Sequence, residues 1–106
     1  MQSFQLLELE NRATEERSPY LEFLRVPSMS LGIYRIAAGK TDPQSPHKQD
    51  EVYYVLSGKA KLEVSDKRVD AIPGTILFVE ANATHKFVEI EEDLEVLVFF
   101  APAEQS

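Results

Sequence analysis

Two histidines and a nearby carboxylate are the residues of this chain whose types and spacing suit metal chemistry. His47 lies four residues before Glu51, and His85 lies in a separate segment further along the chain. Side chains two apart share a face of a strand, so His47 and Glu51 should point the same way, with His85 facing them from another strand. Two histidines and one carboxylate form the donor set of non-haem iron oxygenases, and these donors also suit manganese, nickel or zinc. The pattern indicates a transition-metal site; a surface histidine or a simple His–Glu contact would also produce it.

The elements that must position these residues are short strands. Residues 59–64 and 68–72 alternate polar and apolar side chains, and a Pro73-Gly74 turn follows them. Further strands are expected at 21–26, 31–36, 52–56, 75–79, 85–89 and 95–100, with an acidic loop at 91–93. This regular spacing predicts an all-β antiparallel domain, either a sandwich or a closed barrel. Residues 8–17 are a helical candidate with poor apolar spacing, so we expect an extended arm or an irregular lead-in there.

Composition narrows the class of protein. At 106 residues the chain should form one domain, and its net charge of −7 argues against nucleic acid or an anionic membrane as a partner. The absence of cysteine excludes disulfides and thiolate ligands. The longest apolar run, 96–101, is too short to span a bilayer, and acids within the N-terminal apolar stretch are unlike a signal peptide. We therefore expect a soluble, cytoplasmic protein.

The residues around His47 form a recognisable motif. The spacing from Gly39 through His47 and Glu51 to Gly58 resembles the first motif of the cupin superfamily, with Ser45 in the place of that motif's first histidine. The second cupin motif is matched by Gly74 and His85; the residues that depart from it are Glu80, Asn82 and Glu89. The short segment between the two motifs is similar to that of small bacterial single-domain cupins, whose activities are mostly unassigned.

The resemblance implies a fold and a metal site. It implies a single domain over 1–106 with a double-stranded β-helix (jelly-roll) barrel, an N-terminal arm at 1–20, and motifs at 39–58 and 74–89. It further implies that His47, Glu51 and His85 bind a divalent metal, which would be Fe, Mn, Ni or Zn. Ser45 stands where a further ligand would be. A neutral hydroxyl is a poor donor to such a metal, so Ser45 is expected to hold a water or to bond Gln49.

Other side chains are candidates for the substrate site. Gln49 would orient a water or substrate, or lie exposed in a loop. Glu89 would be a supporting carboxylate or general base, or part of the acidic surface. Arg35 would anchor a carboxylate substrate if it points inward, and would be a surface residue otherwise. Tyr53 is expected in the barrel lining, together with Val55, Ile76, Phe78, Phe87 and Val98.

An apolar outer face is also expected. It would be formed by Tyr54, Leu56, Leu21, Phe23 and Phe99, and either a second copy or the N-terminal arm would cover it. On this basis we expect a homodimer.

The expected function is a small metal-binding cupin that acts on, or binds, a small polar molecule in its barrel. If it is an enzyme, dioxygenase-like oxidation and metal-assisted isomerase or lyase chemistry both fit the donor set. The alternatives are a non-catalytic module that binds or senses a small ligand, and a metal-free structural barrel.

Overall fold

The structure, a computed structural model, describes residues 1–44 and 46–105. In these residues one helix, α1 (Leu6–Glu16), precedes six strands. The strands are β1 (Tyr20–Val26), β2 (Met29–Ile36), β3 (Asp50–Val64), β4 (Lys67–Ala71), β5 (Ile76–Val79) and β6 (His85–Ala101). The expectation of an all-β antiparallel domain is confirmed for the body of the chain.

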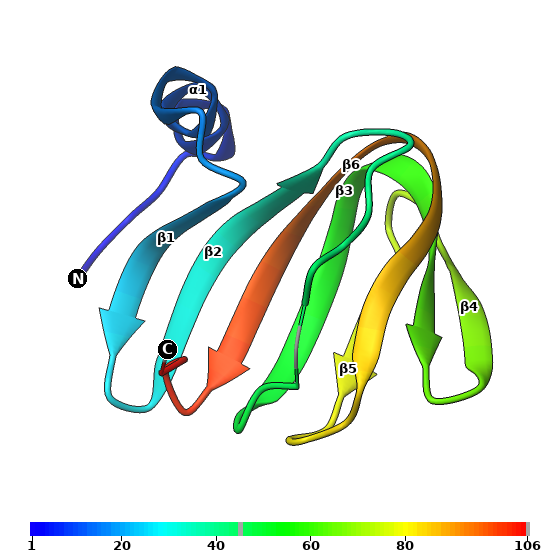
Figure 1. Cartoon of the computed structure of the whole chain (residues 1–106). Helices are drawn as coiled ribbons and strands as arrows, with labels where there is room; N and C mark the ends of the chain where they lie inside the picture. Colours follow the sequence, from blue (N-terminus) through cyan, green and yellow to red (C-terminus); the bar gives the residue numbers. More distant parts are fainter. Residues whose placement is uncertain (45, 106) are drawn as a thin grey trace.

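The strands form one strongly curved antiparallel sheet. Its order is β1-β2-β6-β3-β4, and β5 pairs with the first part of β3. The long strands β3 and β6 bend over together, so that the sheet folds back over its own inner face (Figure 1). Among the described residues the edge strands β1 and β4 do not pair with each other, so the sheet is an open jelly roll rather than a closed barrel. The buried core on the inner face includes Tyr53, Val55, Leu62, Phe87 and Val96.

Two pairs of expected strands are each a single bent strand. Strand β3 continues through Gly58, and β6 continues through 91–93, where an acidic loop was expected; that expectation is wrong. Register shifts between Val55 and Lys61 allow the two strands to stay paired while they bend. The acids at 91–93 are exposed, and Glu91 lies 3.1 Å from the Nζ of Lys59. A run of solvated charges therefore marks the outer side of a bend here, not the end of a strand.

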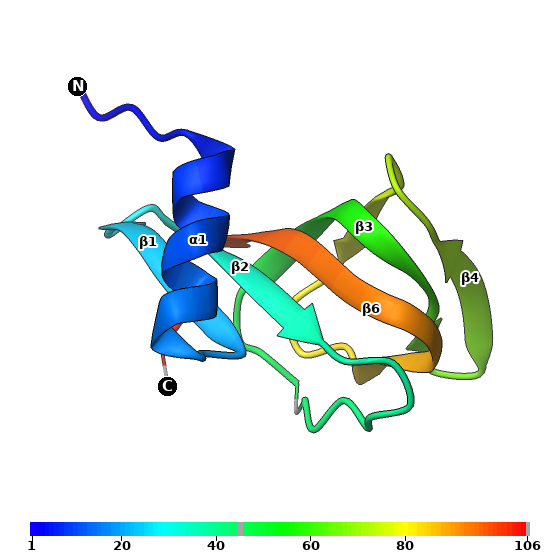
Figure 2. The same cartoon turned by 90° about the horizontal axis from the view of Figure 1, so that it is seen from above.

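The N-terminal segment is helical, so the expectation of an extended arm at 8–17 is wrong. The helix buries Leu9 and Ala13, which are one turn apart, and its other positions are mostly strong helix formers. Arg17, with a φ of 51°, ends the helix in the left-handed conformation. Figure 2 shows α1 lying across β1 and β2. Two buried residues on one face are enough to keep this segment helical, because packing against the sheet stabilises the helix.

Arg35 of β2 attaches α1 to the sheet. Its guanidinium donates to Glu95 Oε2 at 2.7 Å, to Thr14 Oγ1 at 2.7 Å and to the carbonyl of Glu10 at 3.0 Å. Glu95 is only 7% exposed. The outward side of β2 is thus tied to the helix by one side chain.

Replacing Arg35 with alanine is expected to lower the free energy of unfolding by about 2 kcal/mol, because a buried carboxylate loses its partner. Urea unfolding measures the change. Arg12→Ala is the matched control, since it breaks an exposed pair with Glu16 that contributes about 0.5 kcal/mol or less. Equal losses in the two variants would contradict this role for Arg35.

The faces of β5 are reversed relative to expectation. Ile76 and Phe78 are 71% and 65% exposed, so their assignment to the lining is wrong; Val79 is buried and Leu77 half-buried instead. Across the pairing with β3, Ile76 lies opposite Tyr54, which is also exposed. The expected apolar outer face therefore extends over β5. Part of it is covered, since Leu21 is buried and Phe4 packs edge-on against Phe23 with ring centroids 5.0 Å apart. The homodimer remains a prediction.

In the part of the chain that the structure describes, no helix has the length and apolar character needed to cross a membrane.

Candidate metal centre

The curved sheet brings His47, Glu51 and His85 together. His47 lies in the segment between β2 and β3, Glu51 is the second residue of β3, and His85 is the first residue of β6. One donor atom from each lies within 4.8 Å of the others. The segment that carries His47 is held in place where the His47 carbonyl accepts a 2.7 Å hydrogen bond from the backbone N–H of Asn82. Residues far apart in sequence thus converge with the geometry of a three-ligand site.

Glu51 and His85 form the most buried part of this cluster, at 2% and 3% exposure. Their closest atoms, Glu51 Oε1 and His85 Nε2, are 2.9 Å apart. Two ligands that bind one metal at right angles, each about 2.1 Å from it, lie about 3 Å apart. Within the described chain, neither oxygen of Glu51 has an aligned hydrogen-bond partner. Because a buried carboxylate without aligned hydrogen bonds is costly, this donor pair fits a divalent cation.

The ring of His85 is held in the orientation that a metal ligand needs. Its Nδ1 lies 2.8 Å from the carbonyl oxygen of Ala83, which can only accept, so Nδ1 carries a proton. In the neutral ring the Nε2 lone pair then faces Glu51. Burial lowers the pKa of His85, but contacts with Glu51 and Ala83 outweigh burial and raise it above the ordinary value. A metal and a proton would therefore compete for this nitrogen.

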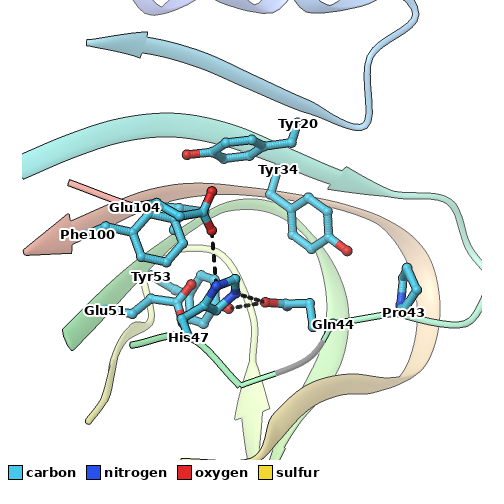
Figure 3. Close-up of a pocket in the computed structure, with 10 residues that line it drawn as sticks. Tyr20, Tyr34, Pro43, Gln44, His47, Glu51, Tyr53, Phe100 and Glu104 are labelled. Atoms are coloured by element: carbon cyan, nitrogen blue, oxygen red, sulfur yellow. Dashed lines mark hydrogen bonds and ion pairs between the residues drawn. The ribbon is translucent and has the colours of Figure 1, made fainter. Parts of the chain in front are cut away.

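His47 is supported by a carboxylate from the end of the chain. Its Nδ1 lies 3.0 Å from Glu104 Oε2, and its Nε2 lies 3.3 Å from Gln44 Oε1 (Figure 3). Phe100 packs edge-on against the imidazole, with ring centroids 5.0 Å apart. A carboxylate on one ring nitrogen orients the other toward a metal. His47 therefore has the support expected of a metal-binding histidine.

His47 and Glu51 line a cavity of about 210 Å³, a space of roughly seven water volumes, and His85 adjoins it through its contacts with Tyr53 and Glu51. The lining residues are Tyr20, Tyr34, Pro43, Gln44, His47, Glu51, Tyr53, Val98, Phe100 and Glu104. Burial is the main cause that raises the pKa values of Tyr20, Tyr34 and Tyr53, so all three hydroxyls stay protonated at neutral pH. The cavity suits a small ligand that meets the Tyr20 hydroxyl, unpartnered within the described chain, on one side and the His47–Glu51 cluster on the other.

Comparison with known proteins assigns the family. Residues 32–100 match the sequence model described as "Cupin domain". The chain belongs to the cupin family. It is 46% identical to an uncharacterised protein of Streptomyces coelicolor over 104 residues, which are 98% of this chain and 99% of that protein. The cupin fold and the resemblance seen in the two sequence motifs are therefore confirmed.

Solved structures agree with this assignment. A crystal structure of a protein from Thermus thermophilus matches with a TM-score of 0.78 and 25% identity, over 97% of this cupin and 99% of that chain. A cupin family protein of Methanocaldococcus jannaschii, described as having a double-stranded β-helix fold, matches with a TM-score of 0.71 and 18% identity. That match covers 78% of each chain.

The other predicted site residues of this cupin are placed differently. Tyr53 lines the cavity, and its hydroxyl lies 3.2 Å from His85 Nε2. Gln49 is buried at 5% exposure but does not line the cavity. Arg35 is bound to α1 and Glu95 on the other side of the sheet, so it is not the inward anchor for a carboxylate that one interpretation required. Ser45 lies outside the described residues.

Glu89 is a surface residue of the cupin. It is exposed and pairs with Arg68 at 2.9 Å, as the acidic-surface interpretation expected. Its φ of 50° shifts the alternation of β6, so that Ile90 rather than Glu89 follows Phe87 on the inner face. The interpretation of Glu89 as a general base beside His85 is therefore wrong.

Asp42, Gln44 and Glu104 are among the site residues of the cupin that were not expected from its sequence. Asp42 is 3% exposed and accepts hydrogen bonds from the Tyr34 hydroxyl at 2.6 Å and the Phe87 N–H at 2.8 Å. These residues come from a loop and from the segment after β6, where no periodic pattern indicates which way a side chain points. The one sequence signal that could have indicated any of them is the position of Gln44, directly before Ser45 in the first motif.

Replacing Glu104 with alanine is expected to weaken metal affinity about 10- to 100-fold, because the ring of His47 loses its orienting carboxylate. Chelator competition on the purified protein measures this affinity. Gln105→Ala, at the neighbouring exposed position, serves as the control and should match wild type. If Glu104→Ala also matches wild type, the carboxylate does not support the metal site.

Proposed function

We propose that this cupin binds a divalent transition metal through His47, Glu51 and His85 and uses it to act on a small polar molecule in the cavity. The observation that carries the proposal is the convergence of the three donors on a buried carboxylate whose oxygens lack aligned hydrogen bonds. The support from Ala83 and Glu104 adds to it, since both imidazoles are held as metal-binding histidines are.

The metal would supply a Lewis acid or an oxygen-binding centre with open coordination positions. The protein's own side chains define what surrounds it. Val98, Phe100 and Pro43 give the cavity an apolar wall that limits water, which strengthens polar contacts inside. The Tyr34 hydroxyl is already donated to Asp42, whereas the Tyr20 hydroxyl has no partner within the described chain although it is buried in the cavity lining. A ligand that accepts a hydrogen bond from Tyr20 would satisfy this hydroxyl.

The charge of the cavity limits the ligand class. None of its described lining residues is a lysine or arginine, whereas Glu51 and Glu104 both line it. A ligand carboxylate would find its positive partner only at the metal. The proposed ligand is therefore a small molecule that presents hydroxyl, carbonyl or single carboxylate oxygens to the metal and places its remaining polar groups near the tyrosines.

Metal analysis of the wild-type protein tests the proposal. Protein purified without chelator is expected to retain close to one equivalent of iron, manganese, nickel or zinc by mass spectrometry. Protein that emerges metal-free, and takes up none of these ions on addition, would show the proposal to be wrong.

Assays with small-acid and thiol substrates then distinguish the kinds of activity. Oxygen uptake indicates dioxygenase-like chemistry, and product formation without oxygen uptake indicates isomerase or lyase chemistry. Metal-bound protein that is silent across the panel but binds a member of it favours the non-catalytic binding module.

A further inference from the structure

The side-chain amide of Gln44 is held in one orientation. Its Nε2 donates a 2.8 Å hydrogen bond to Asp42 Oδ2. A carboxylate can only accept, so the amide nitrogen must face Asp42 and the amide oxygen must face the opposite way. Asp42 is itself fixed by its bonds from Tyr34 and from the backbone of Phe87. The direction of the Gln44 oxygen is therefore set by the fold.

That oxygen points at the metal cluster. Gln44 Oε1 lies 3.3 Å from His47 Nε2 and accepts a 3.0 Å hydrogen bond from the Tyr53 hydroxyl (Figure 3). Without a metal, an Nε2–H of His47 can donate to this oxygen. A metal-binding imidazole is neutral, and when its Nδ1–H is directed at Glu104 its Nε2 lone pair faces Gln44 Oε1. Two electron-rich atoms then face each other, and a cation bound by both removes the repulsion. The separation is close to the roughly 3 Å between adjacent ligands of one ion.

We propose that the amide oxygen of Gln44 is a fourth protein ligand of the metal, one residue before the position where the first cupin motif has its first histidine. This inference rests on the proposed metal centre. The resulting set would be two imidazole nitrogens and two oxygens instead of three nitrogens and one oxygen. Carbonyl and carboxylate oxygens favour manganese and magnesium, and imidazole favours zinc and nickel, so the exchange shifts selectivity toward manganese.

Cobalt(II) titration of the wild-type cupin and of Gln44→Met tests the ligand role. Methionine keeps the side-chain length but removes the oxygen. We expect affinity to fall about 10- to 100-fold, and the visible absorption of bound cobalt to change because a ligand has been lost. Gln105→Met makes the same substitution at an exposed glutamine that does not line the cavity; it is the matched control and should keep the wild-type spectrum.

Other outcomes overturn the proposal in distinguishable ways. If Gln44→Met binds cobalt with the wild-type affinity and spectrum, Gln44 is not a ligand, although the metal centre stands. Weaker binding with an unchanged spectrum would assign Gln44 a hydrogen-bonding role only. Absence of cobalt binding by the wild type would remove the metal centre itself. Should Gln44→Met fail to fold, Gln44→Asn keeps the amide but withdraws the oxygen by one methylene, and the same loss of affinity and spectral change are expected.

Discussion

Replacing His85 with alanine is expected to abolish stoichiometric metal binding, with a loss of affinity of at least about 100-fold. The variant loses the one imidazole that is both nearly fully buried and oriented by a backbone carbonyl. It also removes the imidazole nitrogen that lies 2.9 Å from Glu51 Oε1, so this buried carboxylate loses its nearest partner. Metal content after purification and chelator competition both measure the effect.

The control for this experiment is Lys86→Ala. Lys86 is the next residue on β6, and its exposed side chain points away from the cavity. It should retain metal at the wild-type level. Circular dichroism distinguishes loss of metal from loss of fold in the His85 variant. A folded His85→Ala protein that holds metal as wild type does would exclude His85 as a ligand.

Replacing Gly58 with alanine is expected to lower the free energy of unfolding by about 3–5 kcal/mol. Gly58 lies at the bend of β3 with a φ of +100°, a conformation that side chains disfavour. An added Cβ would lie 2.6 Å from the Cα of Leu94 and would also overlap the backbone of Asp93. Both obstacles are backbone atoms of β6, so relief requires the two bent strands to separate.

Gly74→Ala separates the cost of a side chain at positive φ from the cost of its clash with β6. Gly74 has a φ of +90°, but an added Cβ there would meet no atom within 4 Å. Its replacement should cost only the conformational penalty, about 1–2 kcal/mol. Urea unfolding of both variants measures the difference. Equal losses would show that the close crossing of β3 and β6 at Gly58 does not constrain the fold.

The convergence of His47, Glu51 and His85 was predictable from the sequence because the motif carries its own geometry. Alternation from His47 through Glu51 to Tyr53 placed these side chains on one face, and the structure buries Glu51 and Tyr53 there. The second motif predicted that His85 would lie close to His47 and Glu51. Gly39 and Gly58, at the ends of the first motif, both adopt positive φ. At these two glycines the sequence pattern and the backbone requirement agree.

Other features were not predictable because they depend on contacts between distant segments. The apolar run of β5 has no alternation, so its sequence does not say which side faces inward, and Phe78 was assigned to the wrong face. The positive φ of Glu89 changes which residues of β6 face inward, and nothing in the residue types predicts this change. The helix at Leu6–Glu16 depends on a partner surface formed by β1 and β2. Gln44 and Glu104 gain their roles only once the loop and the last segment fold over the cluster.

Strand β2 has a consequence for anyone who wishes to redesign the cavity. Tyr34 and Arg35 are neighbours in sequence and face opposite sides of the sheet: Tyr34 bonds Asp42 inside, and Arg35 bonds the helix outside. A change of strand register by one residue would exchange these two environments and place a guanidinium in the cavity. Variants that alter ligand preference through β2 therefore have to be selected for retention of the helix as well as for binding.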